Sequence, residues 1–535
     1  MDPPARGLRS LFCGPVVAPP GTWLAAAVTE PRSAFPVQGA AAPAKGRMPS
    51  PNEPPLVSVP QAPSPRQGIT TTGLPFPDPQ ALDPDLQGLL QGASALLGSW
   101  FSSAIHQPPL PGLAIQPPVA PGLRGIGNNA LLAELQQLMV GAYNPNHPGA
   151  LAHLDPPPLI ASVVGDLIAA GLNNNLLAEE LSPSLSRLEK ALCSWLAEAI
   201  GLPPGSGGVP ASGGSLSNLM ALVVARHQRG LDGVGEAVVL CSADAHVSLA
   251  KAMRVMGLPP GALRSIAVDD AGRLDATRLG EELADLDSHG VPVIAVVATA
   301  GTTVRGAVDP LAAIAALCHQ HGVWLHVDGA IGAVFALADS HRHRVAGLDL
   351  ADSVTVNPQK LLGITKTSSL LLLASPAALG ATFATGLPYM EPSRVGCHGG
   401  ESGLQGTRPA EVLKLWLGLR QLGLEGIAAV LDGAIGRRRQ LEHLLAGDGR
   451  LRVLGGSFHL LAFRPEGLDR DGCDLWSQRT RQLLLREGLM LSRPNYQGLH
   501  HLKAVLGNPH TGSEHLEALS AILLGSCDEA AGSPG

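Results

Sequence analysis

Charged residues are scarce in this sequence. Lys, Arg, Asp and Glu make up only 15% of its 535 residues, and the net charge is −7. The lysines and arginines are scattered along the chain, so the sequence lacks the basic stripe that nucleic acid-binding proteins present to phosphates. A nucleic-acid partner is therefore not expected.

Long hydrophobic runs and paired cysteines are also missing. The Leu370–Leu373 stretch is far shorter than the roughly 20 residues that span a bilayer, so no membrane partner is expected. The seven cysteines lack C-x-x-C spacing; they stand singly at positions 13, 193, 241, 318, 397, 473 and 527. This pattern argues against a zinc site or a disulfide framework and favours a reducing compartment, which we take to be the cytoplasm.

Proline, alanine and glycine dominate the start of the chain. Residues 1–80 show little hydrophobic periodicity, which predicts disorder. A signal peptide is disfavoured because prolines interrupt the apolar stretch after Arg9, and translation could equally begin at Met48. Within 81–140, apolar residues recur at helical spacing. These helices cannot enclose a core by themselves, so we expect them to pack on the main body or on a second subunit.

After Gly201, short apolar segments alternate with helical ones. The predicted strands are AVVLCS, SIAVD, VIAVVATA, VWLHVD, SVTVN and SSLLLLA. Because they are apolar on both faces, they predict a mostly parallel sheet covered by helices on both sides, with ligands bound at the carboxyl ends of the strands. We expect a large domain over 141–412, a smaller α+β domain over 413–525, and a disordered tail over 526–535.

Lys360 lies at the centre of the most suggestive segment, VTVNPQKLLGITKTSSLLLL. The β-branched run breaks at Asn357-Pro358, which places Lys360 on a turn just past a strand, in apolar surroundings. Burial lowers the pKa of an amine and makes it a nucleophile towards an aldehyde. The alternative is an ordinary solvated corner.

A run of small residues, Ser212-Gly213-Gly214-Ser215, precedes the predicted helix SLSNLMALVVARHQ. Small residues let backbone N–H groups approach an anion, and the helix dipole favours negative charge. The segment matches neither a Walker loop nor G-x-G-x-x-G, and an ordinary glycine-rich helix start is the alternative.

Three further polar motifs follow predicted strands. His246 could stack on an aromatic ring, although a capping or core histidine would look the same. ATAGTT, at residues 298–303, offers hydroxyl donors on what is otherwise a simple turn. Asp328 is costly to bury without a cationic partner such as a protonated pyridine nitrogen. A metal site is disfavoured, because only His326 accompanies that carboxylate.

Together these parts suit pyridoxal phosphate. The chain resembles the group II pyridoxal phosphate-dependent amino-acid decarboxylases, which include the glutamate, aromatic amino-acid, cysteine-sulfinate and diaminobutyrate enzymes. The motifs concerned lie between about Pro145 and Pro509: SGGSLSN, ADAHVSLAKA, ATAGTTVRGAVDP, WLHVDGAIGA, ADSVTVNPQKLLG and EVLKLW. The resemblance implies an α/β fold of the aspartate-aminotransferase type (fold type I) and a homodimer with the site at the subunit interface.

The resemblance also implies a role for each matching residue. Lys360 would bind the cofactor covalently, Asp328 would pair with the ring nitrogen and His246 would stack on the ring, so these three are the catalytic candidates. Ala330 would pack on the other ring face, and Thr303 would lie near the ring hydroxyl. The phosphate would be held by Ser212, Gly213, Gly214, Ser215, Asn357 and Gln359.

The sequence departs from the family pattern at four places. Gln359 replaces a histidine, and Ile331 stands where an aromatic wall is common. Lys503 aligns with the carboxylate-binding arginine of glutamate decarboxylases and lacks its bidentate fork. The loop SRVGCHGGESGLQGTR lacks the family's tyrosine, which leaves Tyr389 before it and His398 within it. Lys503, Tyr389 and His398 are therefore the predicted substrate contacts.

The predicted function is α-decarboxylation of a small polar L-amino acid to its amine and CO2. Glutamate, aspartate, cysteine sulfinate and diaminobutyrate all remain open as substrates. The alternatives are another pyridoxal phosphate enzyme on the same scaffold, such as an oxidative deaminase or a lyase, and a degenerate cofactor-binding interaction protein.

Overall fold

The computed structural model describes residues 75–112, 114–393 and 397–531. The chain divides into two compact units, Met1–Ala81 and Leu82–Gly535. Most of the segment predicted to be disordered, and with it Met48, lies outside the described residues. Within the described ranges, the helices lack the combination of length and apolarity that a bilayer crossing requires.

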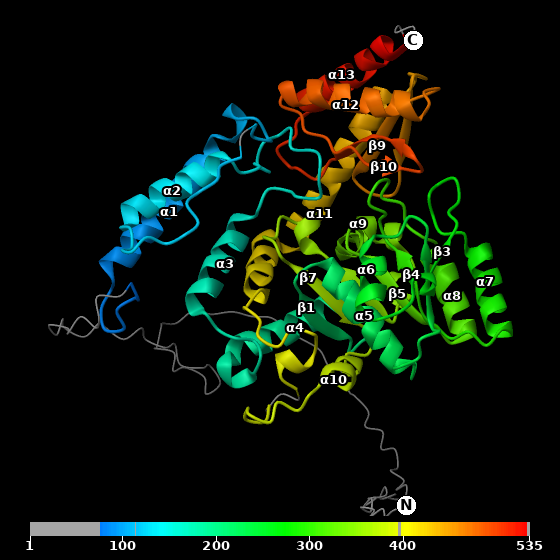
Figure 1. The fold of residues 1–535 in the computed structure, drawn as a ribbon, viewed down its shortest axis with the longest axis horizontal. Coiled ribbons are helices and arrows are strands. Elements are labelled where there is room, and N and C mark those ends of the chain that lie inside the picture. The colour runs from blue at the N-terminus through cyan, green and yellow to red at the C-terminus, as the bar shows by residue number, and fades with distance from the viewer. Residues whose placement is uncertain (1–74, 113, 394–396, 532–535) are drawn as a thin grey trace, which may run out of the picture. The chain divides into compact units, whose positions relative to one another are not determined.

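A seven-stranded sheet is the centre of the second unit (Figure 1). Its strand order is β1-β7-β6-β5-β4-β2-β3, and the neighbours from β6 to β3 are parallel, whereas β7 is antiparallel to both β1 and β6. The strands are β1 (Gly207–Ala211), β2 (Val238–Ser242), β3 (Leu263–Ile266), β4 (Val293–Thr299), β5 (Trp324–Gly329), β6 (Ser353–Val356) and β7 (Ser369–Leu373). The mostly parallel sheet is as predicted.

Strand β1 was not predicted, because its sequence GGVPA has no β-branched run and contains a proline. Pro210 cannot donate to a sheet ladder, which restricts it to an edge strand, and β1 is indeed the edge of this sheet. Gly208 is required for the pairing with β7, since a Cβ there would lie 2.1 Å from the carbonyl oxygen of Leu371. Tertiary packing therefore decided this strand.

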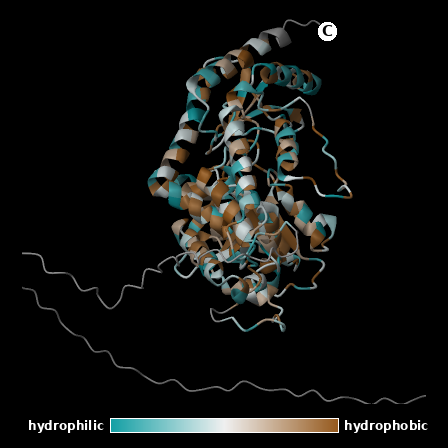
Figure 2. Cartoon of the chain, turned by 90° about the vertical axis from the view of Figure 1, so that its left-hand side faces the viewer, coloured by the Kyte–Doolittle hydropathy of each residue, from teal (hydrophilic) through white to brown (hydrophobic). Residues whose placement is uncertain are grey.

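Helices cover both faces of the sheet, and several strands, such as β2, contribute to two cores. On β2, Val238 and Leu240 pack in one hydrophobic cluster, whereas Val239 and Cys241 pack in another on the opposite face. Figure 2 shows hydrophobic residues concentrated in this sheet-containing body. The helices between residues 160 and 383 are α3 (Ile160–Leu172), α4 (Pro183–Ala199), α5 (Gly214–Gln228), α6 (Ser248–Val255), α7 (Ala276–Ser288), α8 (Leu311–His321), α9 (Asp339–Arg342) and α10 (Ala377–Phe383).

The two predicted N-terminal helices are present as α1 (Pro84–Ser102) and α2 (Asn128–Val140), and they contact one another. Neither helix contains a buried residue, although both are rich in leucine. The apolar faces of α1 and α2 are exposed in the single chain, and so are the side chains of Val164 and Leu167 on α3.

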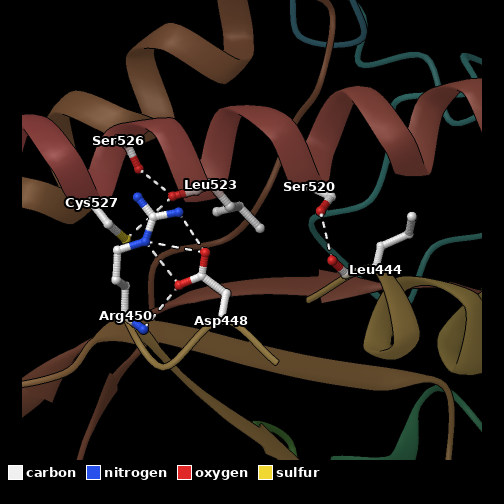
Figure 3. Close-up of polar contacts among 7 residues, drawn as sticks. All are labelled: Leu444, Asp448, Arg450, Ser520, Leu523, Ser526 and Cys527. Atoms are coloured by element: carbon white, nitrogen blue, oxygen red, sulfur yellow. Dashed lines mark hydrogen bonds and ion pairs between the residues drawn. The ribbon is translucent and has the colours of Figure 1, made fainter. Parts of the chain in front are cut away.

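The C-terminal part has its own small sheet and hydrophobic cluster. Strands β8 (Leu451–Gly455), β9 (Leu460–Pro465) and β12 (Leu502–Val505) form the sheet, and β10 (Asn495–Tyr496) pairs with β11 (Leu499–His500). They are grouped with α12 (Arg470–Arg486) and α13 (Ser513–Ala531) in Figure 1. Figure 3 shows a contact between α13 and the end of α11 (Val412–Leu445), where the Ser520 hydroxyl donates to the carbonyl of Leu444.

Two helices extend further than the sequence pattern indicated. The α11 segment (Val412–Leu445) spans two predicted helices, which meet at Gly423, where φ is 62°. It extends from the main core cluster into the C-terminal one, and the predicted domain division at 413 remains a prediction. Helix α13 continues to Ala531, past the predicted end of the ordered chain at 525, because its apolar periodicity carries on through Cys527.

Candidate active site

A cavity of about 200 Å³ lies at the carboxyl ends of the central parallel strands. Most of the residues proposed from the sequence to hold a cofactor line it, and the sheet brings them together from five separate segments. The lining comprises Gly214, Ser215, Asn218, His246, Thr299, Gly301, Thr302, Thr303, Asp328, Ala330, Ile331, Asn357, Gln359 and Lys360.

Lys360 lies on the predicted turn beyond β6, where its backbone N–H donates to the carbonyl of Asn357 at 3.0 Å. Burial lowers the pKa of its ammonium group, and the carboxylates of Asp328 and Asp155 oppose that shift. An amine in this environment loses its proton more easily than an exposed lysine does. It is therefore better suited to attack an aldehyde.

Asp328 is the penultimate residue of β5, and only 6% of its surface is exposed. Its carboxylate accepts hydrogen bonds from Nδ2 of Asn218 at 2.8 Å and from the backbone N–H of Ala330 at 3.2 Å. Both donors are neutral, and among the described side chains no Lys, Arg or His forms an ion pair with this carboxylate. A cationic ring nitrogen would supply the charge partner that the buried carboxylate lacks.

The predicted anion-binding end of the cavity lies at the start of α5, where the first N–H groups have no intrahelical acceptor. Gly214 is necessary there, since a Cβ would lie 2.9 Å from Nδ2 of Asn357. Oδ1 of Asn357 accepts from the Ser369 hydroxyl at 2.6 Å, and Oε1 of Gln359 accepts from a backbone N–H, so both amide NH2 groups remain available as donors. Ser212 and Gly213, also predicted here, do not line the cavity.

The turn after β4 supplies the hydroxyl groups expected from ATAGTT. Gly301 has a φ of 112°, and a Cβ there would lie 2.8 Å from Cβ of Ile331. The Thr299 hydroxyl is buried and has no partner among the described residues, although it faces the cavity. Sequence reasoning selected Thr303 from this motif and missed Thr299, because only the folded turn shows which hydroxyl is left without a partner.

Lys503 lies at the margin of the cavity, where its Nζ donates to the carbonyl of Thr303 at 3.2 Å. Burial, together with the nearby charge of Lys360, lowers the pKa of Lys503 to about 8. A second recess, which Lys360 also lines, contains His153 and Asp155, and the sequence prediction missed both. They stand in the proline-rich segment AHLDPPP, and two titratable residues in so apolar a loop were a usable signal.

Tyr389 and His398 are not brought to this cavity within one chain. Tyr389 is 70% exposed. His398 lines a separate cavity of about 330 Å³, which shares no lining residue with the cavity of Lys360, and its Nδ1 accepts from the backbone N–H of Glu179 at 3.3 Å. Neither side chain lines the cavity of Lys360 in this structure, so their predicted contact with the substrate remains a proposal.

The conserved pattern described as "Pyridoxal-dependent decarboxylase conserved domain" matches residues 129–464. The chain belongs to this family. The L-2,4-diaminobutyrate decarboxylase of Rhizobium meliloti (strain 1021) is 31% identical over 395 residues, which cover 72% of this chain and 79% of that protein. The cysteine sulfinic acid decarboxylase of Rattus norvegicus is 30% identical over 381 residues, or 66% of this chain and 76% of that protein.

Solved structures share the fold. The crystal structure of Oryza sativa TDC with PLP and tryptamine superposes with a TM-score of 0.78 at 23% identity, covering 84% of this chain and 99% of that one. That of mouse CSAD in apo form gives a TM-score of 0.75 at 24% identity, covering 82% and 99%. The predicted family, fold type I, and pyridoxal phosphate-dependent decarboxylase activity are thus confirmed, and pyridoxal phosphate is the cofactor. The roles of single residues remain proposals.

Proposed function

We propose that this decarboxylase acts on a small polar L-amino acid and that the cavity of Lys360 is its active site. The observation that carries the proposal is the convergence of Lys360, the ion-pair-free carboxylate of Asp328 and the start of α5 on one cavity, with the ammonium of Lys503 at its margin. The Lys503 cation at that place favours the binding of a substrate through a carboxylate group.

Each residue has a distinct task in this proposal. Bound pyridoxal phosphate supplies an electron sink for the electrons released when the C–CO2 bond breaks. Lys360 provides the amine that attaches the cofactor, and Asp328 holds the ring nitrogen in its protonated form. His246 and Ala330 confine the ring, and Thr303 lies beside its hydroxyl. Donors from the start of α5 and from Asn357 and Gln359 bind the phosphate.

A homodimer is part of the proposal, because two of the assigned substrate contacts lie away from the cavity of their own chain. Tyr389 and His398 of one copy would approach the cavity of the other, which requires the site to lie near the subunit interface. The exposed apolar residues of α3, such as Val164 and Leu167, give such an interface a surface to bury. We also propose a cytoplasmic location, from the isolated cysteines.

Substrate affinity is expected to depend on pH through Lys503. Its ammonium form, which binds a carboxylate, predominates below a pKa of about 8 and is lost above it. The KM for a carboxylate-bearing substrate should therefore rise above pH 8, by up to roughly tenfold per pH unit. Lys503→Arg keeps its charge at every pH tested, so in this variant the rise should vanish. A wild-type profile identical to that of the arginine variant would contradict the assignment.

The substrate is identified by a panel assay on the purified protein loaded with pyridoxal phosphate. Each common L-amino acid, cysteine sulfinate and diaminobutyrate is incubated separately, and CO2, amine, aldehyde and ammonia are measured. Equal amounts of CO2 and amine from one small polar amino acid are expected. Aldehyde with ammonia would indicate an oxidative deaminase instead, and a coloured protein that turns over nothing would indicate a degenerate binding protein.

A further inference from the structure

Asn218 lies directly behind the carboxylate of Asp328, on α5, and is 1% exposed. Its amide makes all four hydrogen bonds that such a group can make. Nδ2 donates to Oδ2 of Asp328 at 2.8 Å and to the hydroxyl of Ser248 at 3.0 Å. Oδ1 accepts from the hydroxyl of Thr355 at 2.7 Å and bonds with Nε2 of His326 at 3.1 Å.

The orientation of this amide follows from its partners. A carboxylate oxygen can only accept, so the atom that faces Asp328 must be the NH2 group, and the carbonyl must face His326. Nε2 of His326 therefore carries a hydrogen. This ring is completely buried, and its burial lowers the pKa to about 4, so His326 is neutral and its Nδ1 is an acceptor.

The hydrogen bonds on the Nδ1 side of His326 run in the same direction, towards Asn218. Its Nδ1 lies 2.9 Å from the hydroxyl of Ser353, and that hydroxyl accepts the indole N–H of Trp324 at 2.9 Å. Because an indole can only donate, the hydrogen of Ser353 is free to point at His326. Every donor in this row points towards Asn218, and the row ends on Asp328.

A second branch leaves Asn218 through Ser248. The hydroxyl of Ser248 accepts from Nδ2 of Asn218, and its own hydrogen points to Nδ1 of His246 at 2.9 Å. The backbone N–H of Ser248 also donates to that nitrogen, at 3.2 Å. Nδ1 of His246 is thus an acceptor, and in the neutral ring the hydrogen resides on Nε2.

We propose that Asn218 is a positioning residue that fixes two catalytic groups together: the carboxylate of Asp328, through one amide hydrogen, and the tautomer of His246, through the other. Its side chain does not itself react. It holds the carboxylate of Asp328 aimed into the cavity, and it presents an N–H group, rather than a lone pair, on the other ring nitrogen of His246. This inference rests on the proposed pairing of Asp328 with the ring nitrogen.

The test compares two cofactors on the apoenzyme, without turnover. Pyridoxal 5'-phosphate and its 1-deaza analogue, which has CH in place of the ring nitrogen, are titrated into wild type and Asn218→Ala, and both dissociation constants are measured by absorbance. Wild type should prefer the natural cofactor clearly. The variant should lose on the order of tenfold of that preference, since a hydrogen bond to a charged group is removed, while its affinity for the analogue changes by less than about threefold.

The outcomes distinguish the proposed pairing of Asp328 with the ring nitrogen from the role inferred for Asn218. If wild type binds both cofactors equally, the proposed pairing of Asp328 with the ring nitrogen is wrong. If wild type discriminates and Asn218→Ala discriminates just as well, only the inference about Asn218 is overturned. Should the alanine variant fail to fold, Thr355→Val removes one of the bonds that orient the amide; it should lower the preference in the same direction, and an unchanged preference would refute the inference.

Two further variants serve as controls. Ser248→Ala removes the hydroxyl that links Asn218 to Nδ1 of His246, so it should alter the visible circular dichroism of the bound cofactor. Ser526→Ala removes a buried hydroxyl of α13 that accepts the indole N–H of Trp476 at 2.9 Å. This variant loses a buried hydrogen bond outside the site, as Asn218→Ala does within it, and both of its dissociation constants should stay within about twofold of wild type.

Discussion

Lys360→Ala is expected to reduce decarboxylation by on the order of 10³-fold or more, because no other amine in the cavity is placed to attach the cofactor. In the described structure Lys360 lines the cavity on a turn fixed by Asn357, whereas Lys503 is bonded to the carbonyl of Thr303. The measurement is turnover of the substrate found in the panel assay, together with borohydride treatment and peptide mapping. Wild type should give a labelled peptide that contains Lys360.

Lys503→Met is the matched comparison for this prediction. It removes the other buried amine near the cavity, so it should raise KM but leave the label on the Lys360 peptide. Label that persists at its usual peptide in Lys360→Ala, or that disappears in Lys503→Met, would show that the attachment site has been assigned to the wrong lysine.

Asp328→Asn should lower kcat by on the order of 10²–10³-fold, the scale of losing one preorganised electrostatic contact. The replacement keeps the size of the side chain and removes the negative charge that is proposed to pair with the ring nitrogen. It also places an NH2 group opposite the donor amide of Asn218 or the backbone N–H of Ala330, so one of those donors loses its acceptor. Cofactor affinity should fall as well, which equilibrium titration of the apoenzyme measures.

Asp352→Asn provides the control for charge removal. Asp352 is a partly buried carboxylate that accepts from the backbone N–H of Leu325 at 2.7 Å. It directly precedes β6, so it lies at the amino ends of the parallel strands, whereas the cavity lies at their carboxyl ends. Its replacement is expected to affect stability more than kcat. Comparable losses of kcat in both variants would mean that Asp328 acts through folding and not through the cofactor.

Local sequence pattern was sufficient to predict most of the sheet. The strands that carry His246, the ATAGTT turn, Asp328 and Lys360 are short, β-branched or doubly apolar, and bounded by turn residues, so their ends could be located without the structure. In a parallel sheet the carboxyl ends of all the strands lie at the same end of the sheet. Placing polar residues at these ends therefore already implied a shared site, and the motif resemblance gave it a chemistry.

Other features depend on contacts between distant segments, and no local pattern carries that information. Strand β1 exists because β7 provides a partner for an edge strand that contains proline, and the cavity of His398 exists because a late loop packs against Glu179. Asn218 looks in the sequence like an ordinary polar residue in a helix. Only the tertiary structure places its amide between His326 and Asp328.

The sequence by itself determined the residues at the strand ends, because strand periodicity and turn chemistry act over a few neighbouring residues, and the resemblance of its motifs to a known family indicated the family and the cofactor. The tertiary structure alone decided which polar groups meet behind those residues and which hydroxyl, such as that of Thr299, is left without a partner. Hydrogen bonds require approach to within about 3 Å. Residues a hundred positions apart reach that distance only when the whole sheet and its helices have packed.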